Sequence, residues 1–282
     1  MQLKLGCNLY LNTLQNAHRM RITSDYLDAL GPPPPNSQNW PSAVEAMIDP
    51  ATGKPYEFNG WGMDGNDTAG DCTIADCCHQ LMLWTANGSG QIVVPTTAQA
   101  IAVYSALTGY DGTPATDHGA DVDTVAQYMK STGMLGHKID GWGNVDPAVT
   151  PFVKWGIEIF GTVKMAFVVP DFAEPDFEAG IPWDYTGQPY KIEGGHDTPL
   201  VMYQSDGTDV MWEVITWGRR QKMTSRFFNH FVMAVVAPVS HDFVKSTGLA
   251  PSGYGLTQML NRLNQVEQSV GTLVTPQSLS RI

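Results

Sequence analysis

Gly70-Asp71-Cys72-Thr73 stands where a glycine-rich loop, residues 61–71, meets a helix-like pattern. Apolar residues then recur at helical spacing until Asn87-Gly88; they are Ile74, Cys77 or Cys78, Leu81 and Trp84. A helix N-terminus lowers the pKa of a thiol through the helix dipole and its free N–H groups, and the thiolate is the nucleophile. Cys72 is therefore a candidate nucleophile, and the alternative is a cysteine that only packs in the core.

The loop before this cysteine offers a second chemical group. Asn66 lies six positions before Cys72. Its side-chain amide can donate a hydrogen bond to the oxyanion that develops during acyl transfer. We therefore expect Asn66 to belong to the same site.

The four cysteines do not indicate disulfides or a metal centre. Three of them fall within seven positions of one expected helix; the four are Cys7, Cys72, Cys77 and Cys78. A secreted disulfide framework spreads its cysteines, so reduced thiols in the cytoplasm are expected. The Cys-x4-Cys-Cys-His spacing lacks paired zinc knuckles, and adjacent helical residues point about 100° apart. We expect no metal and no cofactor.

Composition excludes some partners. The 282 residues, 43% of them hydrophobic, can bury one large core or two lobes around a cleft. The net charge of -12 argues against nucleic acid and against an anionic membrane surface, since both need clustered Lys and Arg. We find no apolar run of a signal peptide or a membrane span, which favours a cytoplasmic protein.

The chain changes character along its length. Residues 1–59 form an irregular arm with a possible short helix near Ser24 and four consecutive prolines, 32–35; residues 60–250 form the main domain, and 251–282 a helix and tail. Helical patterns come first, ending at about residue 88 and then covering about 95–107, 121–131 and 146–160. Strand patterns follow at 162–169, 198–203, 210–216 and 231–236. Helices before strands predict an α+β fold of two lobes with a cleft between them.

His196 is the candidate base. It follows Glu193-Gly194-Gly195 and leads into the apolar run 199–203. A histidine at the mouth of a strand, with glycines that leave room, can face a thiol on the opposite lobe. The alternative is a histidine at a strand edge with no chemical role.

The order of these motifs resembles that of papain-like cysteine peptidases: Gly-Asp-Cys starting a helix, Gly-Gly-His opening a strand, and a later strand ending in Trp-Gly. The chain is more narrowly similar to uncharacterised bacterial and phage proteins. The shared segments are Gly65-Asn66-Asp67…Gly70-Asp71-Cys72, Leu83-Trp84-Thr85-Ala86-Asn87, Gly194-Gly195-His196 and Thr216-Trp217-Gly218…Gln221-Lys222-Met223-Thr224.

The resemblance implies a papain-like two-lobed fold, with the cysteine on a helical lobe and the histidine on an antiparallel β lobe. It implies that Cys72 is the nucleophile, His196 the base, and Asn66 the replacement for the oxyanion-hole glutamine. Two positions depart from the family pattern. Ile215 stands where the family has the asparagine that orients the imidazole, and Thr216 is the nearest polar substitute. Asp197 stands where a small apolar residue is usual, and it can pair with the imidazolium or cap the strand.

Three functions follow as hypotheses. The first is a cysteine hydrolase, a peptidase or amidase that forms an acyl-enzyme on a peptide or amide substrate. The second is a non-catalytic papain-like structural or binding protein, such as a phage virion component, that contacts protein partners through its N-terminal arm and C-terminal tail. The third is a transglutaminase-like acyl transfer.

Overall fold

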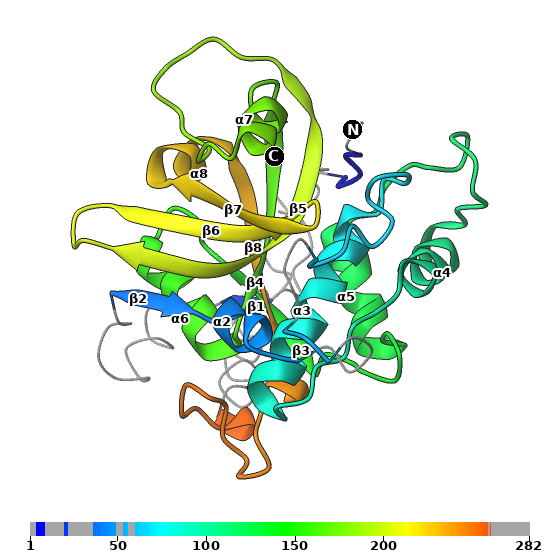
Figure 1. The fold of residues 1–282 in the computed structure, drawn as a ribbon, viewed down its shortest axis with the longest axis vertical. Coiled ribbons are helices and arrows are strands. Elements are labelled where there is room, and N and C mark those ends of the chain that lie inside the picture. Colours follow the sequence, from blue (N-terminus) through cyan, green and yellow to red (C-terminus); the bar gives the residue numbers. More distant parts are fainter. Residues whose placement is uncertain are drawn as a thin grey trace, which may run out of the picture.

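The computed structural model describes residues 4–8, 20–21, 36–48, 53–55, 60–258 and 260, and they form a helical lobe beside a sheet (Figure 1). The helical lobe consists of three helices: α3 (Cys72–Gly88), α4 (Thr97–Thr108) and α5 (Val122–Ser131). Their starts follow the expected signals. Thr96 forms a capping box with Gln99, and the Asp121 side chain accepts hydrogen bonds from the first turn of α5.

The β lobe is built on one mainly antiparallel sheet. The strands are β1 (Met20–Arg21), β2 (Ser37–Asn39), β3 (Gly141–Val145), β4 (Val163–Pro170), β5 (Ile192–Ser205), β6 (Val210–Thr216), β7 (Arg219–Thr224) and β8 (Val232–Val239). Their order is β1-β3-β8-β4-β5-β6-β7, with β2 also paired to β5. Of these pairs only β1 and β3 run parallel. The sheet therefore places β5, the histidine strand, between β4 and β6.

Five further helical segments have complete bounds: α2 (Pro41–Glu45), α6 (Thr150–Phe160), α7 (Ala173–Ala179), α8 (Ser225–Phe231) and the 3-10 helix η2 (His241–Phe243). Within the described residues, no helix combines the length and the hydrophobicity needed to cross a membrane.

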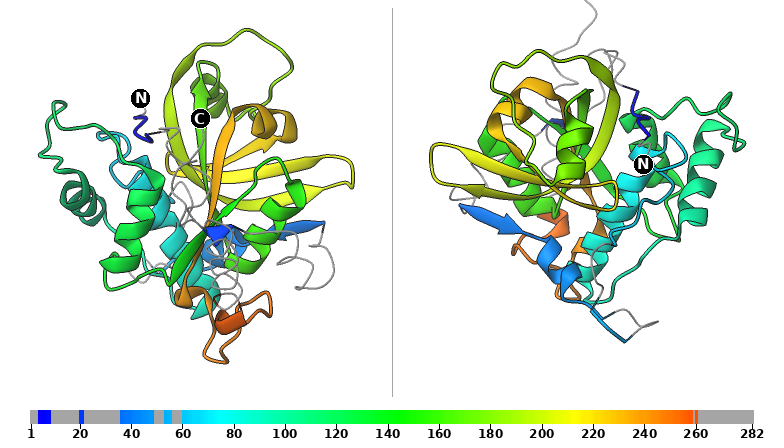
Figure 2. Two further views of the ribbon diagram at one scale, coloured as in Figure 1. Left: turned by 180° about the vertical axis from the view of Figure 1, so that it is seen from behind. Right: turned by 45° about the horizontal axis from the view of Figure 1, so that its top comes forward.

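Helix α3 lies at the junction of the two lobes. Every residue from Cys72 to Ala86 is buried, and the helix packs against β5. Figure 2 shows α3 beside the sheet from two further directions, with α4 and α5 on its outer side. A helix enclosed in this way holds its first residue at a fixed position against the β lobe.

A tight hairpin turn joins β6 to β7. Trp217 (φ 45°) and Gly218 (φ 78°) are its two central residues, between the paired residues Thr216 and Arg219. Positive φ at both positions defines a type I′ turn, which matches the twist of antiparallel strands. A tryptophan in this conformation is uncommon. The turn directs its ring toward β5.

Some predicted boundaries differ from the structure. Strand β5 begins at Ile192, so His196 lies inside the strand and not at its mouth, because the glycines before it pair with β4. Helix α6 begins at Thr150, with Pro151 in its first turn, after a turn that starts at Asp146. The sequence patterns gave no sign of β3, β7, α7 or α8. The expected helix near Ser24 and the prolines lie outside the described residues, as does most of the C-terminal helix, of which 256–258 and 260 are helical.

Candidate active site

Cys72 is the first residue of α3, as predicted, and its side chain is only 1% exposed. Burial raises the pKa of the Cys72 thiol well above its ordinary value, and the nearby charge of Asp197 raises it further. The backbone N–H groups of Asp197 and Gly6 lower this pKa but do not compensate. In this structure the effect of burial therefore outweighs any lowering of the Cys72 pKa by the helix N-terminus.

His196 is held on three sides. Its ring stacks on Trp217, with centroids 4.8 Å apart and planes at 22°, and it meets the edge of Phe167 at 5.7 Å. Its Nε2 lies 2.7 Å from Oγ1 of Thr216, while Nδ1 has no hydrogen-bond partner among the described residues. Burial lowers the pKa of His196 to about 3. The imidazole is thus neutral and oriented, with one ring nitrogen uncommitted.

The structure brings the four predicted site residues together. Cys72, His196, Asn66 and Thr216 all line one small cavity of about 10 Å³, the space that a single water molecule needs. Asn66 is 2% exposed, and its Nδ2 donates to the carbonyl of Ala69 at 3.3 Å. In this state the amide of Asn66 stabilises its own loop.

Thr216 contacts the imidazole of His196 from the neighbouring strand. It is the last residue of β6, and its hydroxyl forms a hydrogen bond with the imidazole of His196 on the adjacent strand, β5. Ile215 also lines the cavity but is fully buried and offers no hydrogen bond. The imidazole partner at this site is therefore a hydroxyl and not an amide.

A buried ion network lies beside the pair, and the sequence reasoning missed it. Lys164 Nζ lies 2.9 Å from Oδ2 of Asp197 and also pairs with the carboxylate of Asp76, and all three side chains are at most 2% exposed. Burial alone would lower the pKa of Lys164, and the charges of Asp197 and Asp76 outweigh that effect and keep the pKa above its ordinary value. The network ties β4 to β5 and to α3. A lone lysine in the apolar run of β4 was the signal.

Asp197 thus takes neither of the two roles considered for it. It pairs with Lys164 rather than with the imidazolium, and it lies within β5 rather than at a strand end. Because Asp197 directly follows His196 in the chain, its ion pair with Lys164 fixes the backbone next to the candidate base.

Residues 4–8 lie across the site, between β5 and the helical lobe (Figures 1 and 2, dark blue). They are held by main-chain hydrogen bonds to both lobes: Lys4 N to Asn66 O at 3.3 Å, Cys7 N to Gly195 O at 3.1 Å, Asn8 N to Ala120 O at 3.0 Å, and Ala120 N to Gly6 O at 2.8 Å. Nothing in the sequence pattern predicted this contact, because main-chain bonds to distant segments leave no local period.

The closest approach is made at Gly6. A Cβ atom there would lie 1.7 Å from the carbonyl oxygen of Gly70, so only glycine fits. The next residue, Cys7, is buried in a small apolar cluster with Cys72, Val122, Ala166 and Val236. Both cysteines are free thiols. Residues 4–8 therefore cover the sulfur of Cys72.

The other two cysteines, Cys77 and Cys78, are buried in α3 as expected for core residues. Among the described residues, no cluster of three or more His, Cys, Asp or Glu side chains has the arrangement to hold a metal ion.

No protein-family model and no curated protein sequence matches the chain. Solved structures do resemble it. Xylellain, a cysteine protease from Xylella fastidiosa, superposes with a TM-score of 0.58 at 11% identity, over 85% of this chain and 98% of that one. The proCathepsin B S9 of Trypanosoma congolense gives 0.54 at 10% identity, over 84% and 86%. Procathepsin L2 from the larval midgut of Tenebrio molitor gives 0.52 at 14% identity, over 85% and 84%. The chain has the α+β fold of papain-like cysteine peptidases, with a helical lobe that carries Cys72 and a β lobe that carries His196.

Proposed function

We propose that the chain is a cysteine hydrolase, a peptidase or amidase, with Cys72 as nucleophile and His196 as base. The observation that carries the proposal is the shared cavity, in which the thiol at a helix N-terminus and an oriented imidazole meet Asn66 and Thr216. A nucleophile, a base and a group that orients the base are the parts that covalent acyl transfer needs.

In the proposed mechanism the two nitrogens of the His196 ring have different roles. When Nε2–H donates to the hydroxyl of Thr216, Nδ1 carries the lone pair and has no competing partner. Nδ1 then takes the proton from the Cys72 thiol as the sulfur attacks the substrate carbonyl carbon. The imidazolium returns that proton to the leaving amine, and a thioester remains on Cys72. Water, deprotonated by the same nitrogen, hydrolyses the thioester and restores the thiol.

The oxyanion would be held by two donors. One is the backbone N–H of Cys72, which belongs to the first turn of α3, where N–H groups have no partner within the helix. The other is the side-chain amide of Asn66, after it leaves the carbonyl of Ala69.

The enzyme we propose is latent in the observed state. Cys72 and His196 are each 1% exposed, and residues 4–8 occupy the space through which a substrate would approach. A neutral thiol beside a neutral imidazole also holds little thiolate. Release of residues 4–8 would admit water, lower the Cys72 pKa and raise the His196 pKa, because burial is the first cause of both shifts.

The test is labelling with iodoacetamide near neutral pH, in the full chain and in a chain that lacks residues 1–8. Cys72 in the shortened chain should react faster than a free thiol, and His196→Ala should abolish the difference. A Cys78→Ala variant is the matched control, since Cys78 is buried in the same helix. The proposal fails if Cys72 reacts no faster than a free thiol in the shortened chain and His196→Ala leaves its rate unchanged. Product analysis with an added amine separates hydrolysis from transglutaminase-like transfer.

A second candidate function is that of a non-catalytic papain-like protein with a structural or binding role, such as a virion component of a phage. The burial of Cys72, to which residue Cys7 of the chain's own segment 4–8 contributes, favours it. The N-terminal arm and the C-terminal tail would then contact neighbouring subunits. Particles that assemble normally without this chain would refute this candidate.

A further inference from the structure

Lys164 is a buried cation beside the candidate active site that the proposed mechanism does not use. It lies in β4, and its side chain is 2% exposed. The ammonium donates to the carbonyl of Thr73 at 3.3 Å and lies 2.9 Å from Oδ2 of Asp197. It also pairs with the carboxylate of Asp76 and contacts Sγ of Cys77 at 3.6 Å. A buried ammonium is costly unless it is paired, so its place in the fold depends on these contacts.

Two of these contacts are made by the residues that directly follow the proposed nucleophile and base. Thr73 follows Cys72 in the first turn of α3. Asp197 follows His196 in β5. One ammonium therefore holds both the residue next to the thiol and the residue next to the imidazole. Since the thiol belongs to the helical lobe and the imidazole to the β lobe, this cation joins the two lobes at the reacting pair.

The strand register brings the Lys164 side chain to this place. Ala166 of β4 is paired with Asp197 of β5. Lys164 lies two positions before Ala166, and side chains alternate between the two faces of a strand, so Lys164 and Asp197 project from the same face. Helix α3 supplies the other partners of the ammonium on this face.

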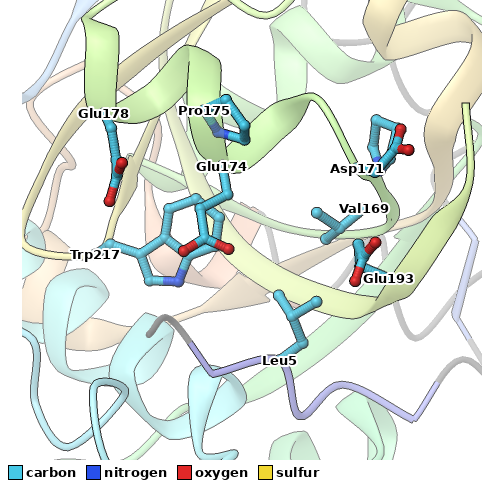
Figure 3. Close-up of a pocket in the computed structure, with 9 residues that line it drawn as sticks. Leu5, Val169, Asp171, Glu174, Pro175, Glu178, Glu193 and Trp217 are labelled. Carbon is cyan, nitrogen blue, oxygen red and sulfur yellow. The ribbon is translucent and has the colours of Figure 1, made fainter. Parts of the chain in front are cut away.

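The imidazole of His196 has a less closely packed neighbour in Trp217. The Trp217 ring stacks on His196 and borders a cavity of about 480 Å³, which Leu5 and Glu174 also line (Figure 3). Atoms that border open space have fewer packing partners than atoms in a filled core. The buried network around Lys164 is therefore the firmer support of the pair.

Stability alone does not explain why this support is charged. Buried ion networks in proteins can often be replaced by apolar residues of similar volume without loss of stability. The charges of Lys164, Asp76 and Asp197 are therefore not needed to fill this part of the core. Their contacts fix directions, because charge-assisted hydrogen bonds require a set distance and angle.

We propose that Lys164 is a positioning residue for the Cys72–His196 pair. Its ammonium sets the separation of the thiol and the imidazole by holding Thr73 and Asp197. The proposal rests on the proposed hydrolase function and adds a residue to its machinery. Lys164 acts through its neighbours and does not touch the substrate. Base catalysis requires hydrogen-bond reach between the two groups, so loss of the ammonium should slow the reaction of the thiol.

The experiment measures iodoacetamide labelling of Cys72 in the full-length Gly6→Ala protein, from pH 6 to 10. The added Cβ atom would lie 1.7 Å from the carbonyl oxygen of Gly70, so it displaces residues 4–8 from the site. Lys164→Met should lower the labelling rate about tenfold at pH 7, where the thiol depends on the imidazole. At pH 10 an ionised thiol needs no base, so the two rates should converge. An unchanged rate at pH 7, or an equal slowing at every pH, would overturn the proposal. The same series in the wild-type chain, over longer labelling times, repeats the comparison at pH 7 without the Gly6 substitution.

A double-mutant cycle shows whether Lys164 acts through the imidazole. His196→Ala should slow labelling at pH 7, and adding Lys164→Met should slow it no further. A rate that falls again by the same factor would contradict the positioning role. His196→Ala with an unchanged rate would reject the hydrolase function, and the positioning role with it. A slow His196→Ala protein beside an unaffected Lys164→Met protein would reject the positioning role alone.

A charge-free variant separates positioning from stability. Asp76→Asn, Lys164→Met and Asp197→Asn together leave no charge of this network unpaired, so urea titration should show more stability than for Lys164→Met alone. Labelling at pH 7 should stay about tenfold slow, because the ammonium is still absent. A labelling rate that recovers together with the stability would refute the proposal, and this variant provides the test if Lys164→Met does not fold. The matched control is Lys154→Met on α6, where the ammonium lies 5.0 Å from the ring centroid of Tyr203; it should label like its parent, and an equal loss there would count against the proposal.

Discussion

Gly6→Ala should open the candidate active site. The substitution changes one methyl group, and the Cβ atom would lie 1.7 Å from the carbonyl oxygen of Gly70, a backbone atom that cannot move aside alone. Residues 4–8 would have to leave their position. Because the sulfur of Cys72 lies beneath this segment, its reactivity reports the change directly.

The size of the effect follows from what holds the segment. Four main-chain hydrogen bonds join it to the two lobes, which contribute about 4 kcal/mol in total. Burial of Cys7 and part of Leu5 contributes about 3 kcal/mol. Ordering the five residues costs about 5 kcal/mol, which leaves about 2 kcal/mol in favour of closure. The site is then open for about one molecule in 30, and Gly6→Ala should raise the labelling rate of Cys72 by up to about 30-fold.

The assay is a time course of iodoacetamide labelling near neutral pH, with each cysteine quantified separately by mass spectrometry after digestion. Cys77 and Cys78 serve as internal references, since both are buried and belong to the main hydrophobic core rather than to the small cluster that holds Cys7 and Cys72. Gly255→Ala is the matched control, because a Cβ atom there meets only ordinary contacts at 3.7 Å or more.

Two results would refute the reasoning. One is a folded Gly6→Ala protein in which Cys72 reacts at the wild-type rate, because closure would then not depend on the segment. The other is an equal rise at Cys77 and Cys78, because the substitution would then have loosened the whole domain.

Three further predictions concern the groups around Cys72. As the pH falls from 7.5 to 5, the unfolding free energy should decrease by about 2 kcal/mol because of His196, whose pKa in the folded protein is near 3, so that only the unfolded chain binds the proton. Urea titrations should show this pH-dependent loss in the wild type and not in His196→Asn. In the opened protein, Thr216→Val should slow Cys72 labelling about 10-fold while Thr216→Ser restores it, and equal rates in both variants would exclude an orienting role. Lys164→Met should lower the unfolding free energy by about 3 kcal/mol or more, measured in urea, because it leaves Asp197 buried without a cation; a neutral result would mean that water reaches the carboxylate.

The parts of the fold with local signals could be predicted from the sequence. The helix at Cys72 has a period and a stop signal, and the helices after Thr96 and Asp121 have capping residues. The strands around His196 were recognised by their apolar runs. Strand β7 was missed because its sequence, Arg219–Thr224, is largely polar, and its pairing with β6 depends on a turn that begins with tryptophan rather than asparagine or glycine.

The residues of the candidate site could be predicted from the sequence, but the burial of its thiol could not. Motif order suggested Cys72, His196, Asn66 and Thr216, and these residues line one cavity; their chemical roles stay predictions. The pKa of the Cys72 thiol could not be predicted, because it depends on burial by residues more than 60 positions earlier in the chain. The position of Cys72 at a helix N-terminus suggests a reactive thiol, but its burial determines how accessible that thiol is to a reagent.

Residues 4–8 and the site that they cover belong to the same polypeptide. Closure is therefore unimolecular, and diluting the protein leaves the closed fraction unchanged. A separate peptide of the same sequence would have to compete with an effective concentration in the millimolar range, typical of short tethers. A proteolytic cut beyond Asn8 removes that advantage in a single irreversible step, since the freed segment diffuses away and does not return at cellular concentrations.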